Sequence, residues 1–326
     1  MSTEMNGIAV AGSILVDRIN EVSVYPECGQ LTKILRVSRA VGGCVPNVAI
    51  GLKTLLPGLE VSAIGKIGAD EDGDYIVAEL KKAGVDCGGI VRSDRSRTSF
   101  TEVISVCGGQ RTFFTYNGAN AEFGYADIGT DALQVRMLHL GYFLLLDRLD
   151  CGEGEKTLRA LQERGIRTSI DLVSESSSSY AKILPCLRYV DNLIVNETEA
   201  GGLAGMVPTD RNISGIAERL KRAGVRERVI IHSPDYSVCL SDSGYTVVAS
   251  YELPAGFIKG TTGAGDAFCA GCLAGIYDGL PDKEILCFAS AAAAAALSAP
   301  DSVSGMRSKA ETENLCKNFD RKKICL

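Results

Sequence analysis

Several groups and signals are scarce in this chain of 326 residues. Only two histidines occur, His139 and His232, so a metal site or an acid–base mechanism built on histidine is not expected. Lys and Arg total 34 against 40 Asp and Glu, which gives a net charge of −6. Because nucleic acids are bound largely through excess positive charge, this balance argues against a nucleic-acid partner.

Long hydrophobic runs are scarce too. The apolar stretch from Ile8 to Val16 is broken by Gly12 and Ser13 and is too short for a signal peptide or a membrane span, so no membrane partner is expected. The 12 cysteines follow no secretory signal, and we expect free thiols and a cytoplasmic location. No G-x-G-x-x-G follows the first predicted strand, which disfavours a dinucleotide-dependent oxidoreductase.

Strand-like and helix-like segments alternate along the chain, which is typical of a parallel sheet covered by helices. We predict strands at 6–12, 61–65, 137–142, 167–171, 193–195 and 229–232, and helices at 46–56, 72–83, 153–164, 263–278 and 282–297. Two other segments, 31–37 and 98–115, favour antiparallel strands, and Gly108-Gly109 in the second is a hairpin signal. We expect them to form a small β appendage over the carboxyl ends of the main sheet, where open α/β sheets bind ligands.

The strongest motif is the glycine-rich segment from Lys259 to Phe268, which leads directly into a predicted helix. Backbone N–H groups at a helix start form an anion site, and glycine lets a phosphate approach closely. The carboxylate of Asp266 has two interpretations here, as a charge that complements the helix dipole or as a general base facing the anion. Because no Lys-Ser/Thr pair follows the glycines, the segment is not a Walker loop.

Other motifs are weaker when taken alone. Asn196 to Glu199 follow a strand and indicate either a helix cap or a group that meets metal and phosphates. Gly42 to Asn47 form a tight turn into a helix. Cys269 and Cys272 form a C-x-x-C pair inside a predicted buried helix, where plain packing is favoured over zinc or redox use.

Together and in this order, the motifs resemble those of the PfkB/ribokinase-like carbohydrate kinase family over nearly the whole chain. The matching segments are Gly12-Ser13 with Asp17, Gly42-Gly43 with Asn47, Gly68-x-Asp70-x-x-Gly73, Gly118-Ala119-Asn120, Asn196-x-x-Glu199 and Gly263-Ala264-Gly265-Asp266. The resemblance implies an α/β fold, a ribokinase-like three-layer sandwich whose mostly parallel central sheet has helices on both faces. It also implies one domain over residues 1–326, with a small β-sheet lid formed by insertions at about 18–41 and 96–117.

The resemblance assigns roles residue by residue. Asp266 is similar to the family's catalytic base, and the N–H groups of Gly263, Ala264 and Gly265 to its anion hole. The groups that correspond to the ATP site are Asn196, Glu199, Thr261, Thr262, Gly263 and Gly265, with Glu199 organising Mg²⁺ through water. The groups that correspond to the substrate site are Asp17, Gly42, Gly43, Asn47 and Asn120.

The function implied is ATP-dependent phosphorylation of a hydroxymethyl group of a sugar or sugar acid. Two alternatives remain: a nucleoside kinase of the same family, and a non-catalytic sugar-binding regulator, against which the intact Asp266 motif argues. A homodimer joined through the lids is expected, because paired lids would cover exposed strand edges.

Three departures from the family pattern carry further expectations. Gly260 stands where the family usually has Asp, which predicts weak or absent activation by a monovalent cation. Cys44, not lysine, follows Gly43, which weakens the case for ribose as the substrate. The aromatic segment from Arg111 to Tyr116 favours packing within the lid over stacking on a base.

Overall fold

The structure is a computed structural model, and it describes residues 5–106, 111–174 and 179–324. Its larger sheet is mostly parallel, with only β12 and β13 antiparallel to their neighbours. In spatial order the strands are β13 (Gly244–Ala249), β12 (Tyr236–Ser241), β11 (Arg228–His232), β10 (Asn192–Asn196), β9 (Arg167–Leu172), β8 (Met137–Phe143), β1 (Ile8–Gly12), β4 (Val61–Gly68) and β5 (Asp86–Ser93).

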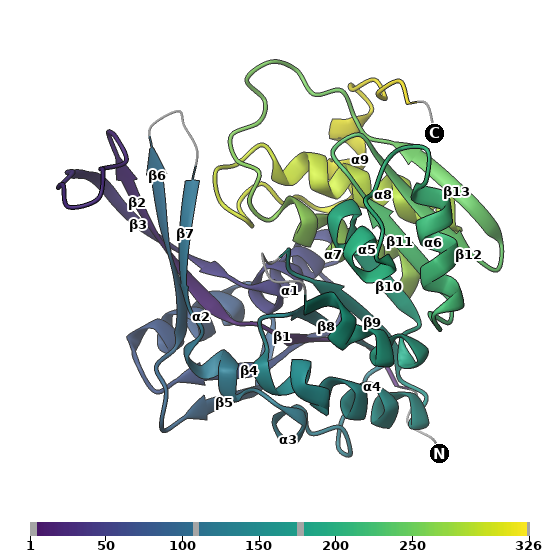
Figure 1. Ribbon diagram of the computed structural model, residues 1–326, viewed down its shortest axis with the longest axis horizontal. Coiled ribbons are helices and arrows are strands. Elements are labelled where there is room, and N and C mark those ends of the chain that lie inside the picture. Colours follow the sequence, from purple (N-terminus) through teal and green to yellow (C-terminus); the bar gives the residue numbers. More distant parts are fainter. Residues whose placement is uncertain (1–4, 107–110, 175–178, 325–326) are drawn as a thin grey trace.

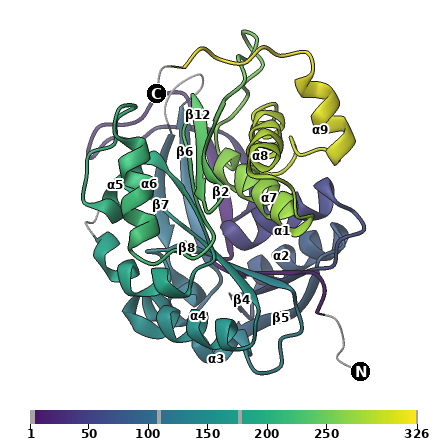
Figure 2. The ribbon, with the colours of Figure 1, turned by 90° about the vertical axis from the view of Figure 1, so that its right-hand side faces the viewer.

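Helices cover both faces of this sheet (Figure 2). On one side lie α1 (Cys44–Leu55), α2 (Glu71–Lys82), α7 (Ala264–Tyr277) and α8 (Asp282–Ala296), and on the other α3 (Tyr125–Ile128), α4 (Gly154–Glu163), α5 (Glu197–Ala204) and α6 (Ile213–Arg222). Successive strand residues point to opposite faces, so Ile8 and Val10 join one core and Ala9 and Ala11 the other. The predicted three-layer sandwich is therefore confirmed.

Shorter elements complete the body. Helix α9 (Lys309–Cys316) packs on α8, and irregular helical turns lie at η1 (Gly118–Glu122), η2 (Leu149–Glu153) and η3 (Ser179–Tyr189). The cysteines of the described residues are all free, and Cys269 and Cys272 are buried inside α7. Within the same residues no helix combines the length and apolarity that crossing a membrane requires.

A second, smaller sheet projects from the body (Figure 1). Its strands, in order, are β3 (Ile34–Gly42), β2 (Leu15–Val22), β6 (Ser99–Val106) and β7 (Arg111–Tyr116). Pairing of β6 with β7 confirms the two predicted hairpin arms, although Gly108-Gly109 lie outside the described residues. The segments predicted as antiparallel strands do pair that way, β3 with β2 and β6 with β7, but the central pair of the small sheet, β2 with β6, is parallel. Their pairing joins the two insertions, so each strand satisfies the other's backbone groups.

Candidate active site

The glycine-rich segment ends at the N-terminus of α7, as predicted. Gly263 is the N-cap residue with φ of 80°, and a Cβ atom there would lie 2.5 Å from Cα of Ser302, so only glycine fits. No side chain caps the helix at this residue, and the N–H of Ala264 makes only a long 3.4 Å hydrogen bond to the Thr261 carbonyl oxygen, so the helix start can still receive an anion.

Asp266, on the first turn of α7, is only 5% exposed. Asn47 Nδ2 donates a hydrogen bond of 2.8 Å to its Oδ2, and the Tyr142 hydroxyl donates one of 3.0 Å to the same atom. Burial, and then the negative charge of Asp171, raise the pKa of Asp266 to about 7, although the two hydrogen bonds oppose the rise. A carboxylate with such a pKa is suited to accept a proton near neutral pH.

Beside Asp266 lies an acceptor atom with no partner. Asn47 Oδ1 is buried and makes no hydrogen bond within the described chain, a costly state unless a ligand donor fills it. Asp17 on β2 lies close enough for its charge to raise the pKa of Asp266 further. Burial raises the pKa of Asp17 itself to about 6, against the opposing charge of Arg111. These polar groups therefore gather on one side of Asp266.

The other predicted substrate residues, Gly42, Gly43 and Asn120, shape the backbone around the site. A Cβ atom on Gly42 would come within 2.6 Å of Asp17 Oδ2, and one on Gly43 within 2.5 Å of the Ser13 carbonyl oxygen. Asn120 is buried with both ends of its amide in use, accepting from the N–H of Ile14 at 3.1 Å and donating to Ser13 Oγ at 3.0 Å. It fixes the segment between β1 and β2.

On the other side of Asp266, Asn196 and Glu199 open helix α5. The Asn196 side chain accepts from the N–H of Glu199 at 2.9 Å, and Glu199 Oε2 accepts from the N–H of Asn196 at 3.0 Å. Ser174 Oγ donates to Glu199 Oε1 at 2.9 Å. The predicted capping interpretation is therefore correct. Burial raises the pKa of Glu199 to about 7 in spite of these donors.

Glu199, Asp171 and Asp266 line one cavity of about 290 Å³ at the carboxyl ends of the central strands. Of the three, Glu199 is the predicted Mg²⁺ residue, and its carboxylate offers the hard oxygen that Mg²⁺ prefers, directly or through water. The motif search missed Asp171, although it follows a hydrophobic strand as Asn196 does. It also missed Ser174 and Tyr142.

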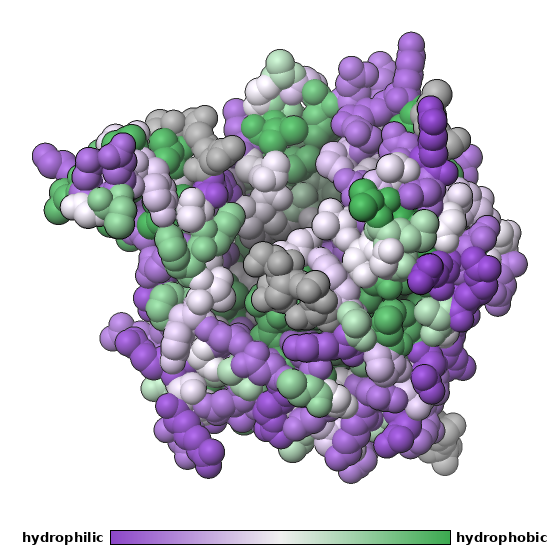
Figure 3. Space-filling view, in the orientation of Figure 1, coloured by the Kyte–Doolittle hydropathy of each residue, from purple (hydrophilic) through white to green (hydrophobic). Residues whose placement is uncertain are grey.

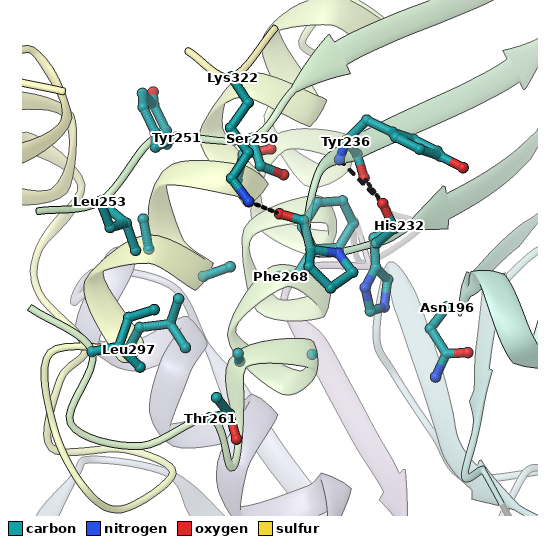
Figure 4. A pocket seen from close by; sticks show the side chains of 18 of the residues that line it. Asn196, His232, Tyr236, Ser250, Tyr251, Leu253, Thr261, Phe268, Leu297 and Lys322 are labelled. Carbon is teal, nitrogen blue, oxygen red and sulfur yellow. Dashed lines mark hydrogen bonds between the residues drawn. The ribbon is translucent and has the colours of Figure 1, made fainter. Parts of the chain in front are cut away.

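A second, larger cavity of about 630 Å³ adjoins the N-terminus of α7. Its wall is largely apolar, and Thr261 lies at its lower edge in Figure 4. The labelled apolar side chains around it are Tyr251, Leu253, Phe268 and Leu297. His232 stacks on Phe268 with ring centroids 4.7 Å apart, and burial lowers the His232 pKa to about 4, which keeps the ring neutral. Such a cavity suits a ligand that places a flat, uncharged ring among these apolar side chains and a charged group at the start of α7.

Thr262 faces a different neighbour. Its hydroxyl accepts a 2.6 Å hydrogen bond from Arg111 Nη1 of β7, so the small sheet contacts the loop that precedes α7. Figure 3 shows the surface hollowed between the small sheet and the body. The prediction that the aromatic segment packs within the lid is wrong for Phe113 and Phe114, which are each 54% exposed.

Beneath Asp266, His139, Asp171 and Cys269 place possible ligand atoms within 4.8 Å of one another. Hydrogen bonds account for this cluster: His139 lies 3.0 Å from Ser169 Oγ through Nδ1 and 3.3 Å from Asp171 Oδ2 through Nε2. We therefore describe it as a hydrogen-bonded group.

Comparison with known proteins agrees with this geometry. The family model for pfkB family carbohydrate kinases matches residues 5–309. The chain belongs to this family. It is accordingly an ATP-dependent kinase with an alcohol group as acceptor.

Individual pfkB relatives differ in substrate. Ribokinase of Arabidopsis thaliana is 26% identical over 95% of this chain and 81% of its own length, and 2-dehydro-3-deoxygluconokinase of Bacillus subtilis is 26% identical over 86% and 87%. The structure of Thermotoga maritima ribokinase superposes with a TM-score of 0.81 at 22% identity, covering 96% of this chain and 100% of that one. The last likeness establishes the ribokinase fold.

Proposed function

We propose that this pfkB kinase transfers the γ-phosphoryl group of ATP to a hydroxymethyl group of a sugar or sugar acid, with Asp266 as the general base. One observation carries the proposal. Asn47 binds the base through Nδ2 and leaves its buried Oδ1 unpaired. A ligand hydroxyl that donates to Oδ1 would stand beside the carboxylate.

In the proposed reaction, Asp266 takes the proton of the acceptor hydroxyl, the hydroxyl oxygen bonds to the γ-phosphorus, and ADP leaves. The N–H groups of Gly263, Ala264 and Gly265 hold the phosphate oxygens at the start of α7. Asn196 and Glu199 would hold Mg²⁺ through water, because hydrogen bonds from the Asn196 N–H and Ser174 already engage the Glu199 carboxylate. The bound ion would offset phosphate charge. The apolar cavity next to Thr261 takes the adenine ring.

Arg111 favours an acceptor that carries a carboxylate. The structure gives its guanidinium only neutral acceptors among the described residues, Thr262 Oγ1 and the Pro300 carbonyl oxygen. It lines a narrow gap together with Asp17. The charge of Asp17 already acts on Arg111 across this gap, and an anionic group of the ligand would add the hydrogen-bonded charge partner that the guanidinium lacks among the described residues. A nucleoside remains the second candidate, since the exposed ring of Phe113 lines the same gap.

The small sheet is proposed to act as a lid and to join two chains. Exposed hydrophobic side chains lie on its outer strands, namely Ile34, Leu35, Val37, Phe113 and Phe114. Because neighbouring strand residues point to opposite faces, a second small sheet would cover those on the face against which it packs, and it would help to exclude water from the phosphate. Light scattering at micromolar concentration should give the mass of a dimer, and a monomer would contradict this proposal.

An ATP-coupled screen of the purified chain tests the function. Sugars, sugar acids and nucleosides are offered separately with Mg²⁺, and ADP release is measured with and without each acceptor. We expect the highest kcat/KM with a sugar acid, and Arg111→Lys should reduce kcat/KM for that acid more than for the matching neutral sugar. Preference for a nucleoside would replace the main proposal by its alternative.

A further inference from the structure

We propose that Tyr142 is a positioning residue for Asp266, presented to it by a bulge in β8. This inference rests on the proposed function, since it takes Asp266 as the base. Tyr142 belongs to none of the sequence motifs, and it lies on β8, whereas the glycine-rich segment leads into α7.

The backbone around Tyr142 departs from regular strand geometry at this point. Leu140 pairs with Ile170 and Phe143 with Leu172, so two residues of β8, Gly141 and Tyr142, oppose one residue of β9. This is a β-bulge, a feature that redirects a side chain.

Tyr142 also has φ of 62°, a value that bulky side chains rarely adopt. A backbone held in so unusual a conformation indicates that its surroundings fix it. The fixing contacts are polar. Asp171, the residue opposite the bulge, accepts a 2.6 Å hydrogen bond from the N–H of Tyr142 through Oδ1. His139 lies 3.3 Å from the other oxygen of Asp171.

Close packing leaves the bulge no freedom to relax. A Cβ atom on Gly141 would lie 2.6 Å from Cys44 Sγ and 3.0 Å from Asp171 Oδ1. Gly141 is therefore limited to glycine, and the next residue must take up the bend. The Tyr142 hydroxyl is thereby held 3.0 Å from Asp266 Oδ2.

The two carboxylate oxygens of Asp266 are therefore hydrogen-bonded differently. Two side chains donate to the carboxylate, and both the Tyr142 hydroxyl and Asn47 Nδ2 bond to Oδ2. Within the described chain Oδ1 receives no hydrogen bond, so Oδ1 is the atom left to take the proton of the acceptor. Burial and the nearby carboxylates raise the pKa of Tyr142 well above its usual value, which keeps the hydroxyl protonated as a donor.

The groups that face Asp266 determine the direction in which each variant shifts the pKa of Asp266. A donor favours the ionised carboxylate and lowers its pKa, whereas a nearby negative charge raises it. The groups around Asp266 are Asn47 and Cys44 from α1, Tyr142 and His139 from β8, Asp171 from β9, Asp17 from β2 and Cys269 from α7. Loss of the Tyr142 hydroxyl must therefore raise the pKa of Asp266, and loss of the Asp171 charge must lower it.

The test compares Tyr142→Phe with wild type in the full chain. The acid limb of kcat/KM for the acceptor should move to higher pH by roughly 0.5 to 1 unit, kcat should fall roughly 3- to 10-fold, and KM for ATP should stay unchanged. Asp171→Asn should move the same limb to lower pH. An unmoved limb in Tyr142→Phe, or upward movement in both variants, would overturn the proposal.

Tyr277→Phe is the matched control. Like that of Tyr142, its hydroxyl donates to a side-chain oxygen, here Oδ1 of Asn6, and it accepts from the N–H of Gly7 at 3.1 Å, but it lies away from Asp266. This variant should keep the wild-type pH profile. A shift equal to that of Tyr142→Phe would show a general effect of losing a tyrosine hydroxyl and would overturn the proposal.

A readout without turnover separates this inference from the proposed function. The ¹³Cγ signal of Asp266, assigned by its loss in Asp266→Asn, is titrated by NMR in wild type and in Tyr142→Phe. A higher midpoint in Tyr142→Phe supports the positioning contact, even if no acceptor is phosphorylated. Failure to phosphorylate any acceptor would reject only the proposed function. Equal midpoints reject the contact whatever the kinase activity.

Discussion

Helices α5 and α7 both carry a carboxylate on their first turn at the same end of the sheet, yet the two helix starts are built differently. In α5, Glu199 turns back to the backbone of Asn196 and closes a capping box. In α7, the cap is Gly263, which has no side chain, and Asp266 reaches Asn47 and Tyr142 on other elements.

The difference shows how one sequence pattern supports two roles. A closed capping box satisfies the donors of its own helix, so α5 is stable by itself and presents Glu199 as a fixed, buried charge. An open cap leaves N–H groups available to a ligand, so α7 offers an anion site where α5 binds its own side chain. Both carboxylates have a raised pKa of about 7, because both are buried beside Asp171.

The largest expected effect comes from removing the base in the open helix start. Asp266→Asn keeps the size of the side chain but cannot accept the proton, so kcat should fall by on the order of 100-fold or more. KM for ATP should change little. Near-normal turnover of purified Asp266→Asn in the coupled assay would reject Asp266 as the base.

The same variant should alter the pH dependence of stability. In the folded state the pKa of Asp266 is about 7 against 3.8 for the free group, so the folded chain binds more protons between those values. This group therefore costs stability as the pH rises through that window. Thermal unfolding of Asp266→Asn relative to wild type should show a larger gain at pH 8 than at pH 5, and equal gains would count against the raised pKa.

A smaller loss is expected when the open cap itself is strained. Gly263→Ala places a Cβ atom 2.5 Å from Ser302 Cα at a positive φ, and kcat/KM for ATP should fall roughly 10-fold or more through displacement of the helix start. Gly265→Ala is the matched variant, since its Cβ atom meets only His232 at an ordinary 3.7 Å. Steady-state kinetics that rank the two variants in the reverse order would contradict this prediction.

In the closed capping box of α5, a substitution of Glu199 should affect Mg²⁺ dependence but not thermal stability. Glu199→Gln keeps an oxygen that can cap α5, so the melting temperature should change little, while the Mg²⁺ concentration for half-maximal rate should rise about 10-fold. Glu311→Gln is the control, because Ser308 and Glu311 form the same capping box on the exposed start of α9. Equal Mg²⁺ dependence in both variants would reduce Glu199 to a structural cap.

Much of the main fold could be predicted from the sequence, because hydrophobic strands and amphipathic helices have strong local periods. The two edge strands, β13 and β5, and β12 beside β13 were not predicted. Partner choice in the small sheet was also missed, since the parallel pairing of β2 with β6 depends on contacts far apart in the chain.

The same distinction between local signals and contacts far apart in the chain applies to the residues of the site. Asp266, Asn196 and Glu199 stand in local motifs, and the structure brings Asn47 and Asp17 to them. Tyr142 and Arg111 carry no local signal, because their roles arise from a bulge and from a contact between the two sheets. Arg321 near the C-terminus is a further long-range case, because its guanidinium donates to the Ala249 carbonyl oxygen at 2.6 Å.

The smallest expected effect concerns monovalent cations beside the open helix start. A Cβ atom on Gly260 would lie 2.7 Å from the Pro300 carbonyl oxygen, so this backbone approach leaves no room for the carboxylate that the family usually has. Asp301, which follows Pro300, is the nearby acid that could replace this charge, but its Oδ1 accepts from the N–H groups of Val303 and Ser304 at 3.0 and 2.7 Å. That oxygen therefore stabilises its own loop.

A cation held there only by neutral oxygens lacks the charge that would offset its desolvation. The initial rate should therefore be the same in KCl and in tetramethylammonium chloride at constant ionic strength. Asp301→Asn, which keeps an oxygen for the turn, should leave that result unchanged. A several-fold activation specific to K⁺ would show that a charged ligand remains near α7, and its loss in Asp301→Asn would identify that ligand as the second oxygen of Asp301.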